Sequence, residues 1–138
     1  MNPGDIAWVG AATALVMVMT PALGFFYAGL VRAKNLVSTL VQCLIIFAVV
    51  SLVWVLWGYS LAFAPSVGGI GIVGDLSHFA LNGVGLEPDG IYTATIPVLL
   101  FFAFQLKFAA ITPALIIGSF AERIKFKALL IFTIIWAT

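Results

Sequence analysis

The chain has 138 residues, of which 64% are hydrophobic and 8% are charged, and its formal net charge is +1. Because soluble domains carry roughly 25% charged residues, this composition excludes an ordinary soluble domain and indicates a membrane protein. The six basic residues form two short groups and one isolated lysine, so nothing supports a surface that binds nucleic acid.

Long uncharged stretches predict the membrane spans in chain order. A spanning helix needs about 20 apolar residues, and the sequence predicts spans at about residues 6–31, 36–64 and 97–121. Residues 128–138 are apolar and supply about half of a fourth span. Residues 65–96, which are rich in glycine and hold three acidic residues, predict a loop. We therefore predict an all-α membrane protein, a polytopic helical bundle.

The first predicted span is a true span and not a secretory signal, because no basic residue precedes it and its apolar run is too long. Asp5 is placed to cap the start of its helix, and Pro21 is placed to kink it. Small side chains at Gly24, Ala28 and Gly29 predict close packing against a neighbouring helix.

The second span and the long loop contain the single cysteine and the single histidine. Cys43 lies within the span, where a buried thiol usually acts as a small hydrophobe. His78 lies in the loop, where we expect a solvated side chain. Residues 69–74 match GxGxxG, but they leave a span and enter a loop, so they do not predict a dinucleotide site. No motif for a metal, a cofactor or a catalytic nucleophile occurs, and we predict none of these and no enzyme.

Five of the six basic residues lie on alternate predicted loops. Arg32 and Lys34 follow the first span, and Arg123, Lys125 and Lys127 follow the third. The long acidic loop between the second and third spans has no basic residue. Because basic loops face the cytoplasm, the N-terminus is predicted to lie outside the cell, and the third span runs from outside to inside.

Lys107 interrupts the third span. Counted back from the inner end, it lies about five residues, or roughly 8 Å, below the outer boundary, so its stem can reach up to the interface. At 3.6 residues per turn it flanks an apolar stripe of Phe101, Phe104, Phe108, Ile111 and Leu115. Such a stripe is most often a packing surface, although aromatic rings near the outer interface also attract a cation that is losing its water.

The ammonium transporter (Amt/MEP) family resembles this sequence in three blocks, which match its first three spans in order and spacing. They are MTPALGFFYAGLVRAKN (residues 19–35), WVLWGYSLAF (residues 54–63) and FQLKFAAITPALIIGSFAERIKF (residues 104–126). The resemblance runs from Asp5 to the last residue, into part of the fourth span. It implies an eleven-span fold of two inverted halves, homotrimers with one pore per subunit, and a chain that is an N-terminal fragment, about a third of such a protein.

The resemblance also implies a function for the intact protein, namely transport of ammonium or ammonia, with methylammonium as an analogue, across the plasma membrane. Phe108 matches the outer gate phenylalanine, and Phe104 matches the aromatic residue one turn outward, which lines the vestibule. The recruiting tryptophan, the second gate phenylalanine and both pore histidines belong to later spans. Lys107 departs from the family pattern, and we expect it to point away from the pore axis.

An Amt-like ammonium sensor is the alternative function, and a polytopic membrane enzyme finds no support in the sequence. A C-terminal region and the two pore histidines would separate transporter from sensor, and neither belongs to these spans. Membrane lipid and a PII-type signalling protein on the cytoplasmic face are the partners that the resemblance implies.

Overall fold

The computed structural model describes residues 1–69 and 71–138, and this part of the chain is helical without named strands. Ile70, which falls within the predicted loop and the GxGxxG match, lies outside the described residues. The α-helices are α1 (Pro3–Met17), α2 (Met19–Leu30), α3 (Leu36–Val53), α4 (Tyr59–Phe63), α5 (Val98–Phe120) and α6 (Phe126–Trp136).

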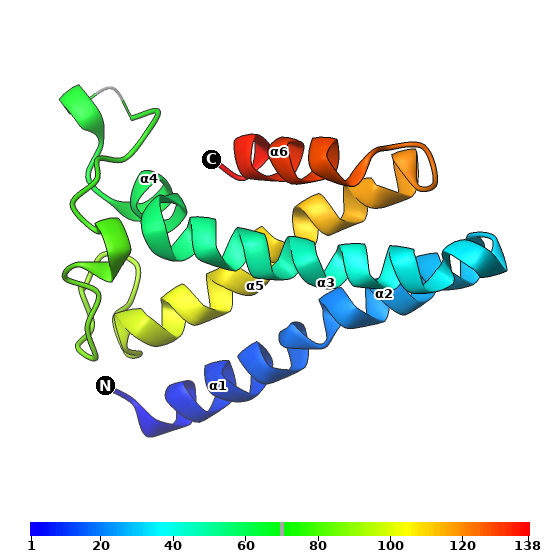
Figure 1. The fold of residues 1–138 in the computed structure, drawn as a ribbon. Helices are drawn as coiled ribbons and strands as arrows, with labels where there is room; N and C mark the ends of the chain where they lie inside the picture. The colour runs from blue at the N-terminus through cyan, green and yellow to red at the C-terminus, as the bar shows by residue number, and fades with distance from the viewer. Residues whose placement is uncertain (70) are drawn as a thin grey trace.

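Three helical stretches are long and apolar enough to cross a membrane. They are Pro3–Leu30, which joins α1 and α2, Ala33–Phe63, which includes α3 and α4, and Val98–Phe120, which is α5. The α2–α3 and α5–α6 connections lie at one end of the bundle, and the N-terminus and the long loop lie at the other (Figure 1). The prediction of an all-α, polytopic membrane bundle is confirmed.

The first span bends between α1, which ends at Met17, and α2, which begins at Met19 (Figure 1). Pro21 has no N–H to donate to the carbonyl four residues earlier, which accounts for a break at this point. The prediction that Asp5 caps the helix is wrong. Asn2 is the cap, since its Oδ1 accepts a hydrogen bond of 2.9 Å from the Gly4 amide, and Pro3 starts the helix one residue later.

Helices α2 and α3 pack closely through small residues. Gly24 and Ala28 are buried, and a Cβ on Gly24 would lie only 3.3 Å from the Cβ of Cys43. A Cβ on Gly29 would meet nothing within 4 Å, so the predicted close packing is correct for the first two positions and wrong for the third. Cys43 is 0% exposed and acts as a small apolar side chain, as predicted.

Helix α5 crosses α3 and forms most of the core with it. The central buried cluster joins α3, α5 and α6, and its members are Cys43, Ile46, Val50, Ala110, Ala114, Ile117 and Leu129. A second cluster lies toward the loop end and contains Tyr59, Val98, Phe102 and Leu106. Pro113 lies inside α5 without ending it, because a buried proline is tolerated where neighbouring helices pack around it.

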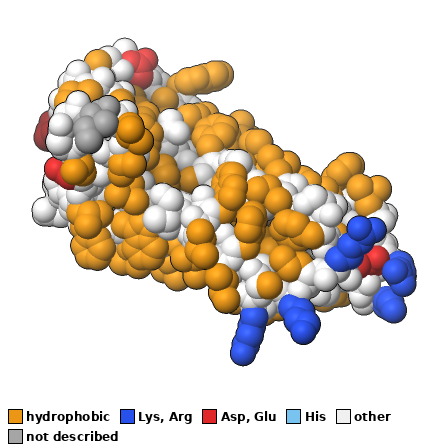
Figure 2. All heavy atoms as spheres, turned by 90° about the horizontal axis from the view of Figure 1, so that it is seen from above, with side chains coloured by type: hydrophobic (Ala, Val, Ile, Leu, Met, Phe, Trp, Pro, Cys, Tyr) orange, Lys and Arg blue, Asp and Glu red, His pale blue; other side chains and the backbone are white. Residues whose placement is uncertain are grey.

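Apart from Lys107 within α5, basic and acidic side chains gather at opposite ends of the bundle (Figure 2). Lysine and arginine side chains gather at the end that holds the α2–α3 and α5–α6 connections, with one acidic side chain, Glu122, among them. The remaining acidic side chains visible in this view lie at the opposite end. The apolar surface between the two ends is the part that a membrane would cover.

Candidate functional site

Phe104 and Phe108, the two predicted site residues, lie one turn apart on α5 and touch each other. Their ring centroids are 5.1 Å apart and the ring planes meet at 70°, so the rings pack edge to face instead of stacking. Phe104 is half-buried and Phe108 is 40% exposed. The Phe108 carbonyl accepts a hydrogen bond of 2.7 Å from the Thr112 hydroxyl, which also fixes that neighbouring polar group.

The exposed side of α5 is continuous below this pair. Phe108, Thr112, Leu115 and Ser119 recur at helical spacing, and all four are exposed. The buried residues of α5, among them Leu106, Ala110 and Ile117, lie on the other side of the helix. The pair of rings therefore faces away from the core formed by α3, α5 and α6.

The predicted phenylalanine stripe divides into two parts. Phe101 packs among aromatic rings at the loop end of the bundle, with its centroid 5.0 Å from that of Phe63 and 6.0 Å from that of Tyr92. Ile111 is buried, whereas Leu115 is 50% exposed. The stripe is thus a packing surface at Phe101 and Ile111 and an open surface at Phe108 and Leu115, with Phe104 half-buried between Phe101 and Phe108.

Lys107 has an aromatic partner that the sequence did not reveal. Its Nζ lies 5.3 Å from the centroid of the Phe47 ring, which belongs to α3. This distance is within the roughly 6 Å over which a ring face attracts a cation. The ammonium group therefore lies on the side of α5 that meets α3, and not over the Phe104–Phe108 pair.

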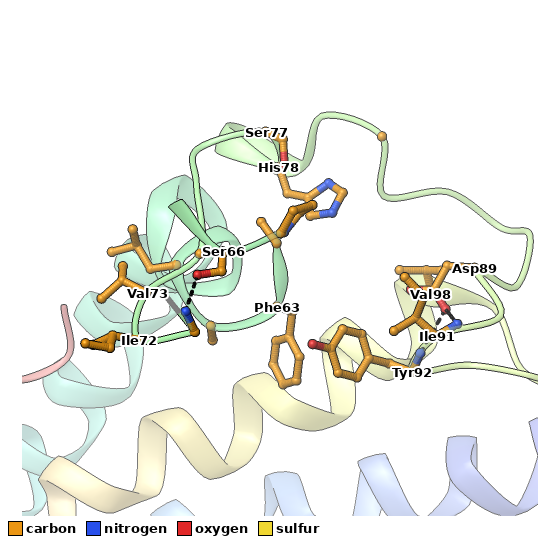
Figure 3. A pocket seen from close by; sticks show the side chains of 17 residues that line it. Phe63, Ser66, Ile72, Val73, Ser77, His78, Asp89, Ile91, Tyr92 and Val98 are labelled. Atoms are coloured by element: carbon orange, nitrogen blue, oxygen red, sulfur yellow. Dashed lines mark hydrogen bonds between the residues drawn. The ribbon is translucent and has the colours of Figure 1, made fainter. Parts of the chain in front are cut away.

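A cavity of about 610 Å³ lies in the long loop, beyond the end of α4. Phe63, Ser66, His78 and Tyr92 line it, and the predicted site residues do not (Figure 3). His78 was expected to be solvated, but it is half-buried. Its amide donates to the Ser60 hydroxyl at 3.0 Å, and its Nδ1 lies 3.0 Å from the Asn82 carbonyl, because the loop folds back onto α4.

Asp89 organises the loop on another wall of this cavity. Its Oδ1 accepts hydrogen bonds of 3.0–3.1 Å from the amides of Ile91, Tyr92 and Thr93. Partial burial raises the pKa of Asp89, but the hydrogen bonds from Thr93, Ile91 and Tyr92 outweigh it and hold the pKa below its ordinary value. The Asp89 carboxylate is occupied by the turn that it stabilises, so its role in this wall of the cavity is structural.

Glu122 joins the α5–α6 connection to the α2–α3 connection. The sequence indicated only that it is the one acid among nearby basic residues. Its Oε1 accepts hydrogen bonds from the Arg32 amide at 3.0 Å and the Asn35 side chain at 2.7 Å. Its Oε2 lies 3.3 Å from the Arg32 Nε. The hydrogen bond from Asn35, followed by that from the Arg32 amide, lowers the pKa of Glu122 below its ordinary value.

Tyr27 connects α2 to α5 near the same end. Its hydroxyl donates to the Leu115 carbonyl at 2.7 Å. Its ring fills the space over Gly118, where a Cβ would lie 2.8 Å from the ring edge. Tyr27, Gly118 and Glu122 also border a second cavity of about 230 Å³.

Comparison with known proteins identifies the family. The model of the Ammonium Transporter Family matches residues 7–138. The chain is 47% identical over 138 residues to an ammonium transporter of Bacillus subtilis (strain 168), covering 100% of this chain and 33% of that protein. It is 41% identical over 149 residues to an ammonium transporter of Mycobacterium tuberculosis (strain ATCC 25618 / H37Rv), covering 98% of this chain and 31% of that protein.

The fold resembles solved structures over its whole length. The crystal structure of Saccharomyces cerevisiae Mep2 superimposes with a TM-score of 0.86 at 35% identity, covering 100% of this chain and 30% of that one. Candida albicans Mep2 gives a TM-score of 0.83 at 34% identity, covering 99% and 29%. The chain spans about a third of the length of the curated relatives it matches. These relatives are named transporters and not enzymes, which confirms that prediction. The chain therefore belongs to the ammonium transporter family, as its three sequence blocks predicted.

Proposed function

We propose that the complete protein carries ammonium across the plasma membrane, with Phe108 as an outer gate and Phe104 as part of the vestibule before it. The family and the names of the relatives support the substrate. The observation that carries the proposal for the site is the exposure of Phe108 on the side of α5 that faces away from the core, with the Phe104 ring against it.

The chemistry of the two rings suits a small cation. The face of an aromatic ring is negative and attracts ammonium, more strongly when the cation has lost water. An edge-to-face pair leaves ring faces available, in contrast to two rings that cover each other. The attraction amounts to about 2 kcal/mol or less, which corresponds to roughly thirtyfold in affinity. The Phe108 ring, by its bulk, would close the path until the cation displaces it.

The proposal includes an orientation and partners. The N-terminus and the acidic long loop lie outside, and the basic end that holds Arg32 and Arg123 lies in the cytoplasm; the separation of charges in Figure 2 supports this. The complete protein is a homotrimer in the plasma membrane, in contact with lipid. The basic cytoplasmic end is the face that a PII-type signalling protein would approach.

Two substitutions of Phe108 in the complete protein test the site. Phe108→Ala removes both the bulk and the ring face, so we expect methylammonium to bind up to roughly thirtyfold more weakly and its flux to change. Phe108→Leu keeps much of the bulk and removes only the ring face, so it separates the gate from the cation site. Leu115→Ala is the matched control, because Leu115 is exposed on the same side of α5 but has no ring.

Binding is measured on the purified protein and flux in proteoliposomes. If both Phe108 variants bind and conduct like the wild type, Phe108 is ordinary packing and the site is wrong. Failure of Phe108→Ala to assemble would also contradict a pore-facing ring. A wild-type protein that binds methylammonium without conducting it would be a sensor of the kind that the sequence left open.

A further inference from the structure

A fixed cation close to the proposed ammonium path requires an explanation. Lys107 lies between Phe104 and Phe108 in the sequence and on the flank of their stripe. A unit charge about 6 Å from a bound ammonium, at an effective dielectric near 20, would weaken binding roughly a hundredfold. A lysine side chain has a flexible stem of four carbons and changes rotamer readily. Conduction therefore depends on where this side chain is held.

The structure holds the Lys107 ammonium against Phe47 of α3, with 5.3 Å between Nζ and the ring centroid. In the described part of the chain the recorded ion pair is Arg32–Glu122, so no carboxylate there competes for Lys107. Within an apolar span a cation without a carboxylate partner gains most from a ring face or a polar vestibule. Phe47 supplies the first of these on the side of α5 that meets α3.

The Phe47 ring is itself fixed in place. It packs against the central cluster and also against the second cluster, toward the loop end, so it lies where the two meet. Contacts with both clusters restrict the rotation of this half-buried ring, and one of its faces is left for the Lys107 ammonium. A rigid ring on one helix thus sets the position of a flexible cation on the next.

We propose that Phe47 is a positioning residue for transport: its ring keeps the Lys107 ammonium on the α3 side of α5 and so keeps positive charge away from the Phe104–Phe108 pair. This inference rests on the proposed function, since it concerns the same ring pair. Without the Phe47 ring the ammonium loses its partner and is free to swing toward the remaining ring faces, those of Phe104 and Phe108. There it competes with ammonium for the rings and repels it.

The test is a double-mutant cycle in the complete protein, read by methylammonium binding. Phe47→Leu should weaken binding by about twofold if the freed lysine spends half of its time near the site, and by roughly tenfold if it spends about nine-tenths of its time there. Lys107→Met should bind as tightly as the wild type or more tightly. The double variant should recover the affinity of Lys107→Met, because the repelling charge is gone. Phe47→Tyr keeps a ring face and should behave like the wild type.

Phe102→Leu is the matched control, because Phe102 is a buried phenylalanine of α5 in the second cluster. Any loss of binding in this variant should not be restored by Lys107→Met. The inference is overturned if Phe47→Leu binds like the wild type, or if the double variant stays as weak as Phe47→Leu. If Phe47→Leu does not fold, Phe47→Met, which fills the space with a flexible apolar chain, takes its place in the cycle.

A second readout separates this inference from the proposed gate. The unfolding equilibrium of the same four proteins in mixed detergent micelles should show a coupling of about two- to thirtyfold between Phe47 and Lys107. If Phe47 and Lys107 show no coupling but Phe108→Ala still binds more weakly, the positioning role of Phe47 is overturned and the proposed gate stands. If Phe47 and Lys107 are coupled but Phe108→Ala has no effect on binding, the proposed gate is overturned. The role of the Phe47–Lys107 contact in transport is then overturned with it.

Discussion

Gly74 lets the long loop lie against the end of α4, and Gly74→Ala should make the loop open more easily. A Cβ at this position would lie 2.5 Å from the Ser60 carbonyl oxygen and 2.9 Å from the carbonyl oxygens of Leu61 and Ala64. All three atoms are backbone, so no side chain can rotate out of the way. The loop would have to retreat by at least about 0.5 Å to reach the shortest contact that real Cβ atoms make.

The retreat strains the hydrogen bonds that fasten the loop. The Gly74 amide donates to the Leu61 carbonyl at 2.8 Å, and the Asp75 amide donates to the Pro65 carbonyl at 2.8 Å. The Ser60 hydroxyl also donates to the Asp75 carbonyl at 2.8 Å. Loss of two or three such bonds, at about 1 kcal/mol each, lowers the free energy of local opening by about 2–3 kcal/mol. Amide exchange there should then be roughly 30- to 150-fold faster.

Hydrogen exchange of a peptide that covers residues 71–78, followed by mass spectrometry on the complete protein, measures this change. Gly85→Ala is the control in the same loop, because a Cβ there meets nothing closer than the Glu87 amide nitrogen at 4.0 Å. Unchanged exchange in Gly74→Ala would refute the steric reasoning. Equal acceleration in both variants would refute it too, since the loop would then be sensitive to any alanine.

The other predictions concern the two ends of the bundle. Because the pKa of Glu122 is lowered in the folded state, its contribution to stability is present above the unfolded value of 4.5 and is lost as pH falls through the folded pKa. The melting temperature of Glu122→Gln should therefore depend less on pH below 4.5 than that of the wild type. If melting temperature changes with pH in parallel in the two proteins, the hydrogen bonds from Arg32 and Asn35 do not stabilise the fold. A cysteine in place of Asn82 should react with an impermeant thiol reagent from outside the cell, and one in place of Ala33 should not; the reverse pattern would contradict the proposed orientation.

Local features of the sequence sufficed to predict the spanning helices, the break near Pro21 and the packing of Gly24 against a neighbour. Each depends on residues within one helix, through the length of an apolar run, a missing N–H or a missing side chain. The family, and with it the candidate positions Phe104 and Phe108, also follows from short blocks of contiguous sequence. Their role in binding ammonium stays a prediction.

Contacts between helices were decided only by the tertiary structure. No local pattern indicates that Lys107 meets Phe47 or that Glu122 binds Arg32 and Asn35, because these partners lie on different helices or connections, far apart in the sequence. A long polar side chain can reach several directions from its helix, and packing selects among them. The contacts of His78 also depend on the tertiary structure. Its side chain is half-buried, and its backbone amide bonds to the Ser60 hydroxyl because the loop folds back onto α4.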